Sequence, residues 1–116
     1  MISNGVKIAF ATEGNNLKDK IALHFGRAKN FLLYDTEKGS FEVFENPEIK
    51  GRELPPDFLA KQGVKAVIAF SLGPRAFEKF KNYKIEVFKA TDGTILENIE
   101  KFKEGELKKL SKEDIF

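Results

Sequence analysis

Two stretches of this chain are apolar at nearly every position, and they constrain its fold more than any other feature. They are Val6–Thr12, which reads VKIAFAT, and Val64–Phe70, which reads VKAVIAF. A strand with one face in water alternates apolar and polar residues, so these runs predict strands that are covered on both faces. We therefore expect both to be central and parallel to each other in an α/β sheet.

Three shorter runs predict the remaining strands. Phe31–Asp35 and Phe41–Glu45 are separated by a short polar stretch that contains a glycine, which predicts a hairpin. The second strand of this hairpin alternates only partly, so we expect it nearer the sheet edge. Ile85–Ala90 predicts a fifth strand.

Three helices are predicted from the residues at their ends. Two prolines precede the first helix, at 57–62, and Pro74 begins a second that runs to about 81. The third begins at Thr94, which has the spacing of a capping box with Glu97.

The order of these elements predicts one α/β domain over residues 1–116. Its core spans about 6–106, and its five-stranded mixed sheet has helices on its faces. Residues 107–116 form a charged tail that is expected either to dock as a short helix or to fray.

The composition excludes several classes of protein. The chain has no cysteine, so it holds neither a disulfide nor a cluster bound by thiolates, and a reducing cytoplasm is its natural location. Its net charge is +2 with acids and bases interspersed, so we expect no nucleic acid partner. Because it has neither a usable signal peptide nor an apolar run of membrane-spanning length, we expect a soluble protein with no membrane partner.

The only histidine of the chain lies in the stretch Leu23-His24-Phe25-Gly26-Arg27, in the loop after the first strand. These residue types suit an anionic or metal-bearing ligand. The histidine supplies a nitrogen lone pair, the glycine allows close backbone approach, and the arginine supplies a planar cation. The alternative interpretation is an ordinary loop histidine beside a glycine turn.

Two further loops are expected to lie beside the loop of His24. The loop of His24 begins at 13–16. If the first strand is the neighbour of Val64–Phe70, this loop and the loops at 71–74 and 91–93 leave the same edge of the sheet. The crevice where strand order reverses is the usual ligand site of an open α/β sheet. This adds the following candidates for ligand binding: Gly14, Asn15, Asn16, Ser71, Leu72, Gly73 and Pro74.

The motifs also have a familiar order. A strand is followed by His24–Arg27, and then by Val64–Ile68, Gly73–Phe77 and Ile85–Lys89. This order and spacing resemble the dinitrogenase iron–molybdenum cofactor biosynthesis family. The resemblance covers about 6–106, which is most of the chain.

The resemblance implies a ribonuclease-H-like, three-layer fold with a five-stranded mixed sheet. It implies a nitrogenase accessory role in which members bind, carry or hand over an iron–sulfur cofactor precursor without known catalysis. By position, His24 would face the metal, while Phe25, Gly26 and Arg27 would shape its pocket. Residues 71–74 would form the facing wall.

One segment departs from the family pattern. Members commonly have a glycine-rich segment between the hairpin and the first helix, whereas Pro47–Pro56 has the single glycine Gly51 and several prolines. If the glycine-rich segment helps to wrap the ligand, this chain has changed or lost that ligand.

We therefore expect a non-catalytic carrier of an iron–sulfur or iron–molybdenum cluster precursor. His24 would be its labile metal ligand, and donor and acceptor proteins of cofactor assembly would be its partners. The cluster would bring its own sulfides, and a second ligand or a partner chain would complete the site. The protein is expected to be a monomer, or a homodimer joined through the apolar residues of the hairpin edge: Phe41, Val43 and Phe44.

Two other classes of function remain open. Ser71, Gly73 and the helix start at Pro74 offer a site for a small anion or phosphate. A metal-dependent nuclease or phosphoryl-transfer enzyme would need converging carboxylates, for which the strand-end residues are the candidates: Glu13, Asp35 and Asp92.

Overall fold

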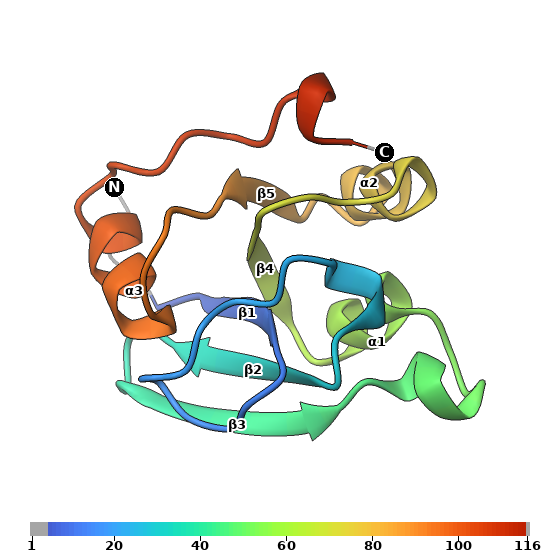
Figure 1. Cartoon of the computed structure of the whole chain (residues 1–116), viewed down its shortest axis with the longest axis horizontal. Helices are drawn as coiled ribbons and strands as arrows, with labels where there is room; N and C mark the ends of the chain where they lie inside the picture. The colour runs from blue at the N-terminus through green and yellow to red at the C-terminus, as the bar shows by residue number, and fades with distance from the viewer. Residues whose placement is uncertain (1–4, 116) are drawn as a thin grey trace.

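A five-stranded mixed sheet lies at the centre of the molecule (Figure 1). The computed structural model describes residues 5–115. Its strands are β1 (Lys7–Thr12), β2 (Asn30–Asp35), β3 (Ser40–Glu45), β4 (Val64–Ala69) and β5 (Glu86–Lys89), in the order β3-β2-β1-β4-β5. β1 is parallel to β4 and β4 to β5, whereas β1–β2 and β2–β3 are antiparallel. The expected strand pairing is confirmed.

Alternate residues of β1 face two separate cores. Ile8 and Phe10 belong to one apolar cluster, Ala9 and Ala11 belong to the other, and all four are fully buried. This burial on both sides explains why the strand lacks polar alternation.

Helices cover both faces of the sheet (Figure 1). α1 (Pro55–Lys61) and α2 (Pro74–Asn82) pack against the core that contains Ala9, and α3 (Ile95–Lys103) packs against the core that contains Phe10. α3 begins with the predicted capping box of Thr94 and Glu97. α1 begins two residues earlier than expected, because Pro55 itself occupies the first turn. Within residues 5–115 there are also three short 3-10 helices: η1 (Phe25–Arg27), η2 (Pro47–Lys50) and η3 (Lys112–Asp114).

The C-terminal residues 107–115, here called the strap, run along the outer edge of β5. The backbone N–H of Lys89 donates to the carbonyl of Lys108 at 2.7 Å, and the N–H of Leu110 donates to the carbonyl of Val87 at 3.0 Å. The strap therefore covers a strand edge that would otherwise be open. Of the two outcomes that the sequence left open, docking is the one observed.

The structure separates the apolar side chains of the His24 loop and of the hairpin edge. Leu23 is 65% exposed, whereas Phe25 in the same loop is buried. At the hairpin edge, the ring of Phe44 packs edge-to-face on Phe58 of α1, with centroids 5.4 Å apart, whereas Phe41 is exposed.

Within residues 5–115, no helix is both long enough and apolar enough to span a bilayer.

Candidate functional site

The His24 loop lies where the strand order of the sheet reverses. β1 and β4 are parallel neighbours, and the chain leaves β1 toward β2 on one side and β4 toward β5 on the other. Two of the predicted loops meet at the carboxyl ends of these strands, because the Ser71 hydroxyl donates to the carbonyl of Leu23 at 3.0 Å. The topology thus brings the His24 stretch and residues 71–74 together, as expected for an open α/β sheet.

His24 and Phe25 have opposite surroundings although they are adjacent. The Phe25 ring is 3% exposed and lies 5.0 Å from the ring of Phe31 and 5.7 Å from that of Phe80. This aromatic contact anchors η1 to the core. His24 precedes η1 in extended conformation, is exposed, and forms no side-chain cap; Arg27 is exposed at the other end of η1. The buried ring thus holds an imidazole and a guanidinium on the surface.

Asn46 fixes the same loop from the end of β3. It is 1% exposed, and its side-chain amide donates to the carbonyls of Gly26 and Ala28 at 3.2 and 2.9 Å. Its side-chain oxygen accepts from the N–H of Glu48 and so caps η2. In the sequence, the position of Asn46 before Pro47 indicates only the end of a strand, and no local pattern indicates its contact with residues 26–28.

A cavity of about 210 Å³ joins the two predicted walls. Phe25 and Gly26 line it from one side, and Leu72 and Gly73 line it from the other. A Cβ on Gly26 would meet nothing within 4 Å, so this glycine borders open space. The remaining lining comes from the segment that departs from the family pattern and from α2: Glu48, Leu54, Pro55, Pro56, Arg75, Ala76 and Lys79.

Two cations of α2 line this cavity, and they differ in their partners. The Lys79 ammonium lies 3.1 and 3.2 Å from the carboxylate oxygens of Asp57. Hydrogen bonds from Tyr83 and Lys79 hold the pKa of Asp57 below its usual value, and the same contact raises the pKa of Tyr83. The charge of Lys79 is thus partly balanced, whereas Arg75 is exposed and takes part in none of the ion pairs found within residues 5–115.

The loop at 14–16 lies at the same sheet edge but forms a separate surface. The Asp19 carboxylate accepts from the N–H groups of Asn15 and Asn16 at 2.8 and 3.0 Å. A Cβ on Gly14 would lie 2.1 Å from that carboxylate, so the close approach requires glycine. Gly14 lines a different cavity, of about 360 Å³, that includes none of residues 24–27. The carboxylate of Asp19 thus occupies the N–H groups that a bound anion would need.

The start of α3, directly after the third loop at 91–93, packs against this second surface. The N–H groups of Ile95 and Leu96 donate to the carbonyls of Asp19 and Leu17, both at 2.9 Å. Asn98, which is fully buried, accepts from the N–H of Thr91. All three loops therefore leave the same edge, but they form two surfaces rather than one.

The start of α2 offers few free donors for an anion. Pro74 has no N–H at the first helical position, and the N–H of Leu72 donates to the carbonyl of Asp114 in the strap at 3.2 Å. Leu72 itself is buried. The start of the helix therefore lines the 210 Å³ cavity but offers few N–H groups to bind a phosphate.

The candidate carboxylates for an enzyme are spread over the molecule. Asp35 pairs across the sheet with Lys7, at the amino end of β1, so it lies at the opposite edge from Glu13. The N–H groups of Lys38 and Glu37 lower the pKa of Asp35, as in an ordinary turn. Within residues 5–115, no three side chains among His, Cys, Asp and Glu are grouped as a metal site.

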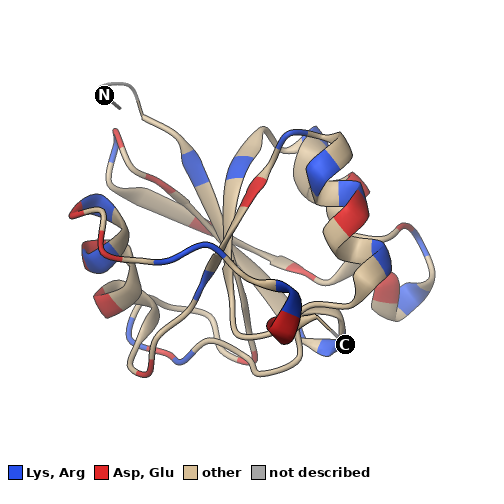
Figure 2. Ribbon diagram, turned by 90° about the horizontal axis from the view of Figure 1, so that it is seen from above, with Lys and Arg blue, Asp and Glu red and all other residues tan. Residues whose placement is uncertain are grey.

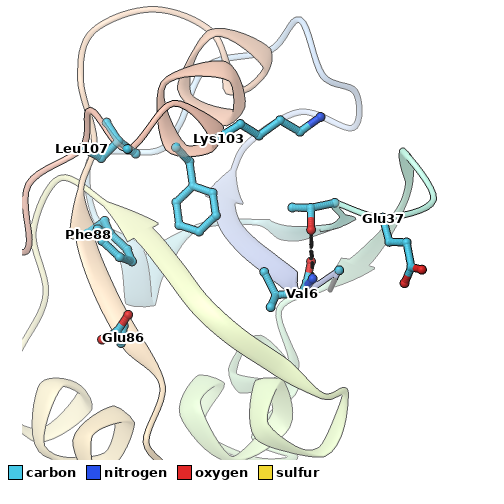
Figure 3. Close-up of a pocket in the computed structure, with 10 residues that line it drawn as sticks. Val6, Glu37, Glu86, Phe88, Lys103 and Leu107 are labelled. Atoms are coloured by element: carbon cyan, nitrogen blue, oxygen red, sulfur yellow. Dashed lines mark hydrogen bonds between the residues drawn. The ribbon is translucent and has the colours of Figure 1, made fainter. Parts of the chain in front are cut away.

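A larger cavity, of about 750 Å³, opens at that opposite edge (Figure 3). Val6, Phe88 and Leu107 contribute apolar surface, and Glu86 and Lys103 contribute charge. The residues that line this cavity include none of the sequence-predicted site residues.

Comparison with known proteins identifies a matching family and several similar proteins. A family model described as dinitrogenase iron–molybdenum cofactor matches residues 6–105. An uncharacterized protein of Methanocaldococcus jannaschii is 34% identical over 111 residues, which cover 90% of this chain and 91% of that protein. A solved structure of a Thermotoga protein provisionally named as NifB is 32% identical with a TM-score of 0.77, over 90% of this chain and 93% of that one.

The apo form of the orange protein from Desulfovibrio gigas is similar in structure, with a TM-score of 0.82 over 90% of this chain and 92% of that one. Its sequence identity is 23%, so this likeness concerns the fold alone.

Proposed function

Since this chain belongs to the dinitrogenase iron–molybdenum cofactor family, we propose that it is a non-catalytic carrier of an iron–sulfur or iron–molybdenum cofactor precursor, bound through His24. The observation that carries the proposal is the exposed His24 imidazole at the switch point of the sheet, held there by the buried ring of Phe25. A carrier must present its cargo to other proteins, and an exposed ligand on a fixed loop allows this.

The donor set suits a preassembled cluster as cargo. The chain has one histidine and no cysteine, so it supplies a single imidazole; the cluster brings its own bridging sulfides, and partner proteins would supply further terminal ligands. A single protein ligand also suits transfer, because one metal–protein bond has to break. The exposed Arg27 guanidinium stands close in sequence to His24 and would offset the negative charge of a sulfide-rich cluster.

The cavity beside Gly26 supports a site larger than one side chain. His24 and Arg27 do not line this cavity, so in this proposal it lies beside the metal ligand, and its apolar lining from Phe25, Leu54 and the prolines at 55 and 56 would shield one side of the cargo from water. In this proposal, the segment 47–56 takes the place of the glycine-rich segment of other members. Donor and acceptor proteins would approach from the solvent side of His24 and provide its second ligand.

The test is anaerobic binding of a synthetic, thiolate-ligated iron–sulfur cluster, followed by iron content and visible absorbance. We expect stoichiometric binding by the natural protein and a loss of at least about tenfold in affinity for His24→Ala, because the only imidazole is removed. Arg27→Gln is expected to weaken binding less, since it removes a charge but no metal ligand.

His24→Ala should leave the fold intact, because the side chain is exposed and caps nothing. Identical circular dichroism and unfolding midpoints are therefore the required control. Binding that is unchanged in His24→Ala would show that the ligand lies elsewhere. Failure of the natural protein to bind the cluster would refute the carrier proposal for this class of cargo.

A further inference from the structure

A further candidate binding surface lies at the amino end of β5, at the opposite end of the strands from His24. It is a cavity of about 330 Å³ between the end of α2, the start of β5 and the strap, here called the lysine groove. Its exposed rim carries Lys81, Lys84 and Lys109, and buried residues such as Leu110 form its floor. In the view of Figure 2, the strap that borders the groove carries a basic stretch before η3.

Lys84 has a backbone conformation that its side chain does not favour. Its φ is +62°, and it is the one non-glycine residue with positive φ in the part of the chain that the structure describes. It follows the C-cap Tyr83, and the N–H of Ile85 donates to the carbonyl of Phe80 at 2.8 Å, which closes α2 as a Schellman motif. Glycine fits this position at lower conformational cost than lysine.

Packing does not explain a lysine at this position, because Lys84 is exposed. Neither Lys84 nor Lys81 takes part in the ion pairs found within residues 5–115. Lys109 lies 2.9 Å from Glu86, which also lines the groove, so one of the three lysine charges is balanced. Residues in disfavoured backbone conformations cluster at functional sites. The exposed charge of Lys84 is therefore available to a binding partner.

We propose that the lysine groove is a docking site for an acidic peptide segment of a partner protein. Carboxylates of the segment pair with Lys81 and Lys84, and an apolar side chain between them rests on the floor beside Leu110. The two unbalanced cations above an apolar floor are complementary to such a segment. A nucleic acid fits less well, because the apolar floor formed by Ile85, Val87 and Leu110 offers a phosphate backbone no partner, whereas an apolar side chain of a peptide can rest on it.

The position of the groove suits a carrier but does not depend on cluster binding. Because α2 runs back from the carboxyl edge of the sheet, a partner at the groove leaves the surface of His24 free. The peptide test below uses the protein without any cluster, so the two proposals fail independently.

The probe is a fluorescein-labelled synthetic peptide of alternating aspartate and glutamate around one leucine, with binding measured by fluorescence anisotropy at low salt. We expect Lys84→Gly to weaken binding about threefold to fivefold. The same variant should unfold at a temperature about 2–4 °C higher, because glycine relieves the backbone cost. Weaker binding by a more stable protein cannot be attributed to unfolding. Lys81→Gln should weaken binding by a similar factor, and added salt should weaken it further.

Lys38→Gln is the matched control, because this exposed lysine lies in the β2–β3 turn, which β1 and β4 separate from β5 and the groove. It should bind the peptide as the natural protein does. The proposal is overturned if Lys84→Gly binds normally, if Lys38→Gln weakens binding equally, or if a single-stranded oligonucleotide of the same charge binds more tightly than the peptide.

Discussion

At the scale of single residues, one buried amide organises the candidate site. Asn46 spans from β3 to the loop of His24, and its side chain satisfies two carbonyl groups of that loop and one N–H of η2. A buried polar side chain with all its partners in place is stabilising, but the same groups are costly when one partner is removed. The position of His24 therefore depends on a residue that makes no contact with solvent.

Asn46→Ala is expected to lower the free energy of unfolding by about 1–3 kcal/mol, because the buried carbonyl of Ala28, the carbonyl of Gly26 and the cap of η2 lose their partner. Urea unfolding measures this. Asn30→Ala is the graded control, since its half-buried side chain donates once, to the carbonyl of Gly14 at 2.9 Å, and should cost less. An Asn46→Ala protein as stable as the natural one would contradict this role.

At the scale of elements, the strap connects regions that are far apart in the chain. Leu107 is buried in the core under α3, and Leu110 is buried in the core under α1 and α2, so the strap crosses from one face of the sheet to the other. Its end pairs with Leu72, next to the wall of the candidate site. Any change in strap docking therefore reaches the loop at 71–74.

The Asp114 carboxylate makes this docking dependent on pH. Hydrogen bonds from the Lys89 ammonium and from the N–H of Ser111 lower the pKa of Asp114. Because its pKa is lower in the folded state, its stabilising contribution is present above the unfolded pKa and is lost as pH falls through the folded one. We expect the strap to loosen below about pH 4.

Hydrogen exchange of the Leu110 N–H measures the docking of the strap locally. Asp35 and Asp57 also have lowered pKa values, so they contribute to the pH dependence of global stability, but they lie outside the strap. In Asp114→Asn, protection at Leu110 should be weaker at pH 7 and should change less between pH 6 and pH 3. Equal pH dependence in the two proteins would show that another group controls the strap.

At the scale of the whole molecule, the two cores share β1 and should unfold together. Leu59 of α1 and Ile99 of α3 are buried in different cores, at 0% and 1% exposure. Leu59→Ala and Ile99→Ala are each expected to cost about 2–5 kcal/mol. Both cores lose part of their packing when β1 detaches from the sheet. Each variant should therefore unfold in a single transition, and the slope of the unfolding free energy against urea concentration should be unchanged.

The two tyrosines offer separate probes of these transitions, since Tyr34 is buried in the α3-side core and Tyr83 contacts Asp57 between α1 and α2. Midpoints that differ between these probes would show that the two faces unfold independently.

The features that could be predicted from the sequence are those that depend on contacts between residues close together in the chain. The continuous apolar runs of β1 and β4, the capping box at Thr94 and the proline start at Pro74 are local signals, and the structure has each of these features. Together they predicted the sheet, its parallel centre and the edge at which the His24 loop lies. The family followed from the order of His24–Arg27, Val64–Ile68, Gly73–Phe77 and Ile85–Lys89 along the chain.

Tertiary structure alone decided how the site is assembled. The contact of Asn46 with residues 26–28 and the strap along β5 left no recognisable pattern in the sequence. The reason is physical. Periodicity and capping act within a few residues, so they are written into a local stretch, whereas a buried hydrogen bond between distant segments forms only once the whole sheet has placed its partners.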